Sequence, residues 1–419
     1  MSPRLLRPAA VWCGFAVVHV YFLGWMASFF LHGWAFSDTE QYREWAMAGY
    51  NAPVSDAVSP WVYPVLAQVP IMLPRLAGHD LYLLAWTLVI TALNAVAMWF
   101  LLHRAPDRQR AAVVAGWWWV VFTAFTGYLS FARVEGVAAP IVFVGLLYAV
   151  RRPVVGAALL SVATWIKVWP AAALLAMVIA LRERVRIVVT GLVVSALVVG
   201  GVLVLGGIEH IADFLLNQGS RGMQLEATFS VPWVWAAVLG VGGSRIADNT
   251  AINSTEVYGP GVQTMAGLMQ PLLLVAVAVA AALLVRALRR GADRGRLVYA
   301  GTLLLTTVLI VFNKVGSPQF MVWLAPVVMV GLLHDRVRWR TPAWLVLGIA
   351  ATTFVIYPLF YTPLIHANPV MAAVLTVRNV LLVALLVWTA RRIWQLGSRA
   401  AVDAEASGRR RPAGRGLAA

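Results

Sequence analysis

The chain has 419 residues, of which 61% are hydrophobic and only 12% are charged, and its mean hydropathy is +0.79. Because a soluble chain carries about a quarter charged residues, this composition excludes a large soluble domain. The formal net charge of +16 lies in short basic clusters between apolar segments, which is typical of membrane topology and argues against a nucleic-acid partner. Cys13 is the single cysteine, which excludes an intramolecular disulfide and a cysteine-based metal cluster.

Long apolar segments recur from one end of the chain to the other. The first follows a short basic leader and is long enough to cross about 30 Å of hydrocarbon, whereas the apolar core of a signal peptide has about 7–15 residues. We therefore expect an uncleaved first helix and, over the whole chain, an all-α polytopic membrane protein with about 12 transmembrane or partly spanning helices. The predicted segments lie at about 9–30, 80–102, 111–129, 135–150, 154–166, 168–181, 186–206, 263–285, 298–312, 319–333, 342–359 and 370–391.

The polar connections between these segments alternate between two kinds. One set is short and arginine-rich, and the other is longer, acidic and aromatic. The positive-inside rule places the arginine-rich set and both termini in the cytoplasm, and the acidic set on the outer face of the cell inner (plasma) membrane. Residues 1–399 are predicted to form one transmembrane bundle, and 400–419 a disordered basic cytoplasmic tail.

Two neighbouring segments, 154–166 and 168–181, are each too short to cross a bilayer alone as upright helices. Predicted cytoplasmic arginines flank the pair on both sides. A hairpin of short helices with Lys167, Trp169 and Pro170 near its apex satisfies both facts. Since a helix break at membrane depth is tolerated only inside protein or beside a wet cavity, this apex is predicted to form part of a cavity wall.

Three acidic residues, Asp38, Glu40 and Glu44, follow the first helix near the predicted outer surface. A carboxylate there suits a general base toward a hydroxyl, if the two groups lie within hydrogen-bond reach. The alternative is a solvated loop in which Asp38 caps a helix, because Tyr42 and Trp45 recur at helical spacing. The residues alone leave both interpretations equally open.

The only two lysines, Lys167 and Lys314, lie at predicted outer turns beside apolar helices. A cation at membrane depth is costly and indicates an anionic partner, although a long stem that reaches the interface is the common alternative. Arg133 and Glu135 either serve the same site or pair with each other. Arg378 lies inside the last apolar segment and is expected to face a cavity.

The predicted outer loop at about 207–260 contains Arg221 and Glu226. Both suit a polar ligand, but a salt bridge between them on the surface is the favoured interpretation. The histidines show no metal-ligand spacing, so no zinc site is predicted. Carboxylates and cations beside lipid suit a substrate with an anionic phosphate, an apolar tail and a polar head, such as a lipid-linked phosphosugar.

Seven short motifs follow one another between about residues 30 and 380. They are Asp38-x-x-x-Tyr42, Tyr63-Pro64, Arg133-x-Glu135, Ile166-Lys167-x-Trp169-Pro170, Arg221-Gly222-x-Gln224-x-Glu226, Ser317-Pro318-Gln319-Phe320-x-x-Trp323-x-x-Pro326 and Arg378-Asn379. In order and placement the set resembles the GT-C superfamily of membrane glycosyltransferases and, within it, the polyprenyl-phosphate-mannose-dependent enzymes of glycosyltransferase family 87. Glu135 departs from the aspartate that is more usual there, and Ala227 from an expected serine.

The resemblance implies a GT-C-like bundle and an inverting glycosyl transfer. Asp38 matches the family's loop aspartate and is expected to deprotonate an acceptor hydroxyl, which attacks the anomeric carbon of a β-linked mannosyl phospholipid. Such enzymes need no metal for the chemistry, so no cofactor is expected. The expected donor phosphate-binding residues are Arg133, Lys167, Lys314, Arg221 and Arg378, and the expected substrate-binding residues are Tyr42, Tyr63, Glu135, Gln224, Glu226, Gln319 and Trp169.

The expected partners are a polyprenyl-phosphate sugar donor, a glycolipid or lipoglycan acceptor of the cell envelope, and the lipid bilayer. Mannose is favoured over arabinofuranose or glucose. A lipid or solute transporter or flippase of the envelope also needs a charged cavity and often uses broken helices, but no repeat relates the two halves, and the polar residues concentrate on one face. A structural subunit of an envelope complex is a third interpretation that the sequence leaves open.

Overall fold

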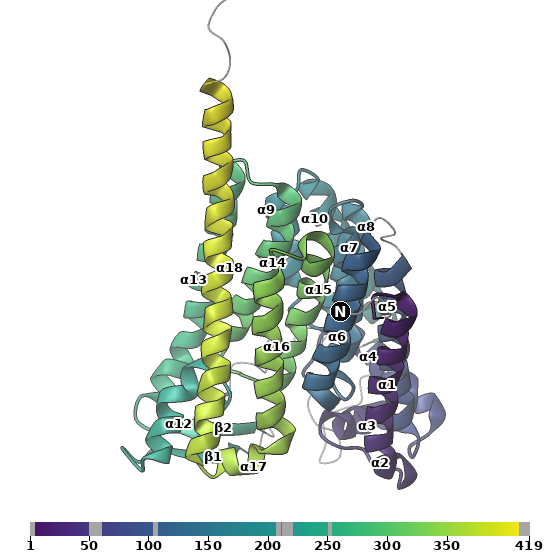
Figure 1. Ribbon diagram of the computed structural model, residues 1–419. Helices are drawn as coiled ribbons and strands as arrows, with labels where there is room; N and C mark the ends of the chain where they lie inside the picture. Colours follow the sequence, from purple (N-terminus) through teal and green to yellow (C-terminus); the bar gives the residue numbers. More distant parts are fainter. Residues whose placement is uncertain are drawn as a thin grey trace, which may run out of the picture.

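The computed structural model describes residues 5–49, 61–103, 108–206, 211, 221–249 and 254–409, and side chains as far as residue 398. Long helices run side by side as a bundle, with shorter helices and a two-stranded sheet at one end (Figure 1). The α-helices are α1 (Pro8–Trp25), α2 (Ala27–Leu31), α3 (Asp38–Ala48), α4 (Gln68–Met72), α5 (Tyr82–His103), α6 (Gln109–Thr126), α7 (Glu135–Ala149), α8 (Pro153–Ile166), α9 (Ala171–Ala180), α10 (Arg184–Leu205), α12 (Val231–Val238), α13 (Val262–Arg289), α14 (Arg294–Val311), α15 (Leu324–Asp335), α16 (Arg340–Phe354), α17 (Tyr361–Ile365) and α18 (Pro369–Arg409). Short helical turns are η1 (Val65–Ala67), η2 (Leu73–Ala77), η4 (Gly127–Ser130), η6 (Thr228–Ser230), η8 (Pro318–Trp323) and η9 (Val355–Leu359). The two strands are β1 (Arg245–Asn249) and β2 (Ser254–Tyr258). They are antiparallel, and their register pairs Arg245 with Tyr258 at one end and Asn249 with Ser254 at the other.

Nine helices within the described ranges are long and apolar enough to cross a membrane. The most apolar stretches of α10 and α13 are only 11% and 17% buried, and they expose large side chains such as Leu192, Leu197 and Leu274. Monomeric soluble proteins rarely expose apolar surface on this scale, whereas lipid tails cover it. The protein is therefore an all-α polytopic membrane protein, as the sequence predicts.

The centre of the bundle consists of α14 and the segment η8–α15, whose apolar stretches are 78% and 89% buried. A helix that is apolar on all sides belongs in such a position. Small residues let neighbouring helices approach closely. A Cβ on Gly156 of α8, for example, would lie 2.8 Å from the Cα of Ala149 on α7.

The predicted hairpin of short helices is confirmed. α8 and α9 have 14 and 10 residues, and Lys167 ends α8 in an extended conformation. Four features lack a prediction: the turns and helix over residues 65–77, helix α12, helix α17 and the hairpin β1–β2. Helix α18 continues to Arg409, past the position where the sequence predicts the start of a disordered tail, and residues 410–419 lie outside the described ranges.

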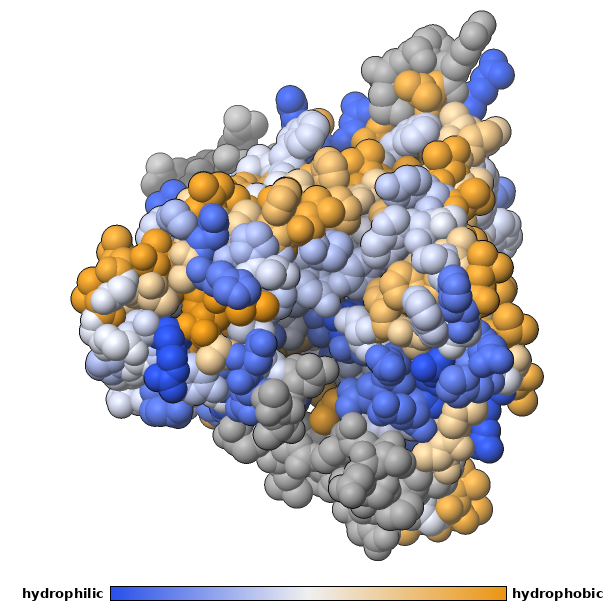
Figure 2. Space-filling view, turned by 90° about the horizontal axis from the view of Figure 1, so that it is seen from below, coloured by the Kyte–Doolittle hydropathy of each residue, from blue (hydrophilic) through white to orange (hydrophobic). Residues whose placement is uncertain are grey.

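The two ends of the bundle differ in character. The short elements α3, α12, α17 and β1–β2 lie together at the lower end in Figure 1, and the arginine-rich turn between α13 and α14 lies toward the upper end. Seen from the lower end, hydrophilic residues gather around a hollow near the middle of the face (Figure 2). The polar candidate residues are positioned by the elements of this end.

Candidate active site

The first residues of the site come from the start of α3 and the turn before α7. Arg133 pairs through Nη1 with Oδ1 of Asp38, and through Nη2 it donates to Ser37 Oγ at 2.7 Å and to the Tyr357 hydroxyl at 3.4 Å. The Arg133 side chain is 6% exposed, and that of Asp38 is 26% exposed. The cap position of α3 belongs to Ser37, so the helix is confirmed, but the interpretation of Asp38 as its cap is wrong.

A second ion pair joins the start of α7 to the turn between α8 and α9. Lys167 Nζ lies 3.0 Å from Oε1 of Glu135, whose side chain is 1% exposed. The same Nζ lies 4.3 Å from the centre of the Tyr63 ring. Arg133 and Glu135 thus do not pair with each other. The alternative that they do is wrong, because each faces a different element of the fold.

Two tyrosines extend this polar group. The hydroxyls of Tyr42 and Tyr63 lie 3.0 Å apart, and the backbone N–H of Val134 donates to Tyr42 at 3.3 Å. Burial raises the pKa of both phenols above the ordinary value. Burial also lowers the pKa of Lys167, an effect that Glu135 opposes.

A third ion pair connects the loop after residue 221 to α18. Arg378 Nη1 donates to Glu226 Oε2 at 2.7 Å, and Nη2 donates to the Glu226 carbonyl. Both side chains are 1% exposed. The surface salt bridge expected between Arg221 and Glu226 is therefore wrong: Glu226 is buried and pairs with an arginine far along the chain. The expectation that Arg378 faces a cavity is also not met, since the residue is 0% exposed.

Backbone contacts fix the same loop against the turn before η8. The N–H of Gln224 donates to the Lys314 carbonyl at 3.0 Å, and its Oε1 accepts the N–H of Gly316 at 2.9 Å. Ser317 Oγ donates to that oxygen at 3.3 Å. A Cβ on Gly316 would overlap the backbone of Ala227, so only glycine permits this approach. Gln224 thus acts on the protein backbone in the structure.

Glu256, on β2, is a site residue that the sequence does not reveal. Its carboxylate is nearly buried and accepts the N–H of Gly222 at 2.9 Å and the hydroxyl of Tyr258 at 3.2 Å. A Cβ on Gly222 would lie 2.6 Å from Oε2 of Glu256. Strand β2 and the loop meet only in the folded chain, and no spacing in the sequence connects them.

Arg221 is the cation of this group that has no carboxylate partner within the described part of the chain. Its Nε is buried and has no hydrogen-bond acceptor there. The charge of Arg221 lowers the pKa of Lys167 and of Lys314, in each case after the larger effect of burial. Arg221 thus acts electrostatically on both lysines, and a group of neighbouring cations of this kind suits an anionic ligand.

Two further candidates have different surroundings. Trp169 is 2% exposed, and its ring stacks on Trp323 with the centres 5.7 Å apart. Trp323 also stacks on Phe320 at 4.2 Å. Gln319 is partly exposed on η8. The structure thus places the Trp169 ring in the core next to Lys167, and roles in substrate binding stay predictions for Trp169 and Gln319.

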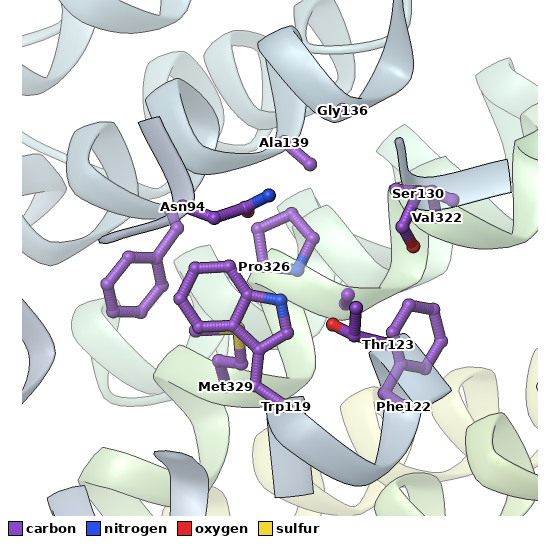
Figure 3. Close-up of a pocket in the computed structure, with 12 residues that line it drawn as sticks. Asn94, Trp119, Phe122, Thr123, Ser130, Gly136, Ala139, Val322, Pro326 and Met329 are labelled. Atoms are coloured by element: carbon purple, nitrogen blue, oxygen red, sulfur yellow. The ribbon is translucent and has the colours of Figure 1, made fainter. Parts of the chain in front are cut away.

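A small cavity adjoins the start of α7 inside the bundle (Figure 3). Asn94, Thr123 and Ser130 contribute polar groups to its wall, and Trp119 and Met329 are among its apolar neighbours. Hydrogen-bonding walls at membrane depth suit ordered water. No set of three potential metal ligands from His, Cys, Asp and Glu occurs among the residues that were placed.

Comparison with known proteins identifies the chain. No curated protein and no solved structure matches it. The model of glycosyltransferase family 87 matches residues 61–312, which is more than half of the chain. The matched region includes Arg133, Glu135, Lys167, Arg221 and Glu226. The chain therefore belongs to glycosyltransferase family 87 and is a multi-pass membrane glycosyltransferase.

Proposed function

We propose that the protein transfers mannose, with inversion, from a polyprenyl-phosphate-linked donor to a glycolipid or lipoglycan acceptor on the outer face of the plasma membrane. The observation that carries the proposal is the pair of Asp38 with Arg133: a carboxylate still 26% exposed, held by a guanidinium that is 6% exposed. Family membership supports glycosyl transfer over the transporter and structural alternatives. The position of the site at one end of a lipid-facing bundle suits a sugar carried on a lipid.

Asp38 is the proposed general base. Arg133 pairs with Oδ1, and no described residue hydrogen-bonds Oδ2, which leaves that oxygen for the acceptor hydroxyl. As the acceptor oxygen attacks the anomeric carbon, its proton passes to Asp38. The bond between that carbon and the phosphate oxygen breaks, and the electron pair stays on the phosphate. A positioned base of this kind contributes about 10²–10⁴-fold to the rate.

The departing phosphate gains negative charge, and Arg221, Lys167 and Lys314 are proposed to bind it. An anion between them would offset the unfavourable effect of the Arg221 charge on each lysine. Such preorganised cations stabilise the transition state because they do not need to reorient as charge develops. A cation–π contact with Tyr63, whose ring centre lies 4.3 Å from Nζ, helps to keep Lys167 in place.

Arg378 and Glu226 are proposed to act indirectly. Arg378 has no exposed surface, so we propose a positioning role in place of the direct phosphate contact expected from the sequence. The buried pair ties the loop at residues 221–227 to α18, and Gln224 and Glu256 fix the same loop from two other sides. Arg221, at the start of this loop, is thereby held within electrostatic reach of Lys167.

The proposal is tested by transfer of radiolabelled mannose from polyprenyl phosphate mannose to membrane glycolipids by the purified, reconstituted protein. Asp38→Asn is expected to lose at least about 10²-fold in rate. Glu40→Gln is the matched control, because Glu40 is an exposed carboxylate in the first turn of the same helix. Its rate should equal that of the wild type.

The possible outcomes separate the interpretations. Full activity of a normally folded Asp38→Asn protein would move the base to Glu135, Glu226 or Asp56, the last of which lies outside the described residues. Transfer of glucose or arabinofuranose in place of mannose would overturn the proposed donor. Absence of transfer from every lipid-linked sugar would overturn the proposed reaction.

A further inference from the structure

A group of arginines lies at the end of the bundle opposite the candidate active site, where α13 ends beside α18 (Figure 1). Arg286 and Arg289 belong to the last turn of α13, and Arg290 follows it. The guanidinium of Arg286 lies 3.2 Å from the centre of the Trp394 ring on α18. We call the place formed by Arg286, Arg289, Arg290 and Trp394 the basic notch.

Close packing of the two helices builds the basic notch. A Cβ on Gly397 of α18 would lie 2.9 Å from the Cα of Ala287 and 3.5 Å from the Cβ of Arg290. The backbones therefore nearly touch at Ala287. Arg286 and Arg290 precede and follow this contact on the same helical face, since residues four apart on a helix are neighbours.

The cations of the basic notch have no carboxylate partner among the side chains that the structure places. Nη1 of Arg286 is buried and has no hydrogen-bond acceptor. Other arginines at this end have acceptors: Arg294 donates to the Ala180 carbonyl at 2.6 Å, and Arg338 to Asp335 at 2.7 Å. Among the described side chains, the basic notch is thus a concentration of positive charge without a counter-ion.

We propose that the basic notch binds the phosphate of an anionic phospholipid headgroup. Arginine forms paired hydrogen bonds to phosphate oxygens, and basic pockets between transmembrane helices bind anionic headgroups. Helix α13 has 28 residues, or roughly 42 Å at about 1.5 Å per residue, so its end reaches beyond about 30 Å of hydrocarbon into the headgroup layer. Trp394 is 53% exposed, and tryptophan is enriched at that layer.

The surface next to the basic notch favours a lipid over a soluble phosphate. Leu274, Val275 and Val279, about two to three turns before Arg286 on α13, are each at least 60% exposed. Acyl chains of a bound lipid have this apolar face to pack against, whereas a soluble phosphate gains nothing from it. The site is separate from the proposed transfer reaction and does not depend on it.

The test is native mass spectrometry of the purified full-length protein with added phosphatidylglycerol or phosphatidylcholine. Wild-type protein should retain phosphatidylglycerol in preference to phosphatidylcholine. Arg286→Gln/Arg290→Gln should weaken phosphatidylglycerol binding by about tenfold or more, because charge-assisted hydrogen bonds to phosphate are lost. Arg182→Gln/Arg184→Gln, which removes two exposed arginines at the start of α10, is the matched control and should bind as the wild type does.

Three results would overturn the proposal. Equal losses of phosphatidylglycerol binding in both double variants would show that only the net charge of the protein matters. Equal retention of both lipids would show that the charge of the headgroup does not affect binding. Displacement of phosphatidylglycerol by inorganic phosphate at equal concentration would assign the basic notch to a soluble anion. If the double variant does not fold, Arg290→Gln alone, at an exposed position, is expected to give a smaller loss of the same kind, and unchanged binding would refute the site.

Discussion

Removal of Arg378 is expected to destabilise the protein more than any surface substitution. The residue donates to the Glu226 carboxylate at 2.7 Å, to the Glu226 carbonyl and to the Asn379 side chain at 3.0 Å, and the ion pair is 1% exposed on both sides. Arg378→Met would leave a buried carboxylate without a partner. Breaking a buried pair in this way costs about 3–5 kcal/mol in free energy of unfolding.

Replacement of both partners isolates this effect. In Glu226→Leu/Arg378→Met no charge is left buried, and apolar replacements of a buried pair are often neutral. We therefore expect the double variant to regain most of the free energy of unfolding that Arg378→Met loses. It should not regain transfer activity, since the loop that carries Arg221 has lost its tie to α18.

The assay is tryptophan fluorescence of the protein in detergent during denaturant unfolding, combined with transfer activity below the transition. Arg338→Met is the control, because the side chains of its ion pair with Asp335 are 41% and 26% exposed, and such pairs contribute about 0–1 kcal/mol. The reasoning would be refuted if Arg378→Met cost no more than the Arg338 control. It would also be refuted if the double variant were less stable than Arg378→Met alone.

Two further predictions concern the loop and the Lys167 pair. Gly222→Ala is expected to lower kcat/KM for the donor by about tenfold, a barrier increase of about 1.4 kcal/mol. The reason is that the new Cβ would lie 2.6 Å from the Glu256 carboxylate. Gly267→Ala is the control: a Cβ there would have no atom within 4 Å, so kcat/KM should be unchanged. Lys167→Met is expected to abolish most transfer and to destabilise the protein by about 3–5 kcal/mol, since Glu135 is 1% exposed. Lys167→Met/Glu135→Gln should restore the free energy of unfolding and not the transfer, and recovery of transfer would show that Lys167 has only a structural role.

Hydropathy along the sequence was sufficient to predict the class of fold. Each apolar segment is a local property of the chain, and about 20 apolar residues in a row have few stable positions other than a membrane. The short hairpin α8–α9 was predictable for the same reason, since its length and flanking arginines are also local. Helices that contain several prolines or few residues, such as those over 65–77, carry no comparable signal.

The composition of the site was also largely visible in the sequence, as a set of cations and carboxylates at turns on one predicted face of the membrane. The sequence did not reveal which of these cations and carboxylates form ion pairs. Arg133 meets Asp38 from a different element, and Glu226 meets Arg378, which is 152 positions away. Glu256 contacts Gly222 through a strand that the sequence does not predict.

The reason is that a side chain's charge is a property of one residue, whereas its partner is set by how helices pack. Neighbours such as Arg133 and Glu135 face different elements once α7 begins, so closeness in sequence predicts the wrong pair. The sequence by itself determined a membrane bundle, and it predicted an anionic ligand at one end. Only the tertiary structure decided which of the described carboxylates are neutralised and buried, and that Asp38 stays partly exposed beside a fixed arginine.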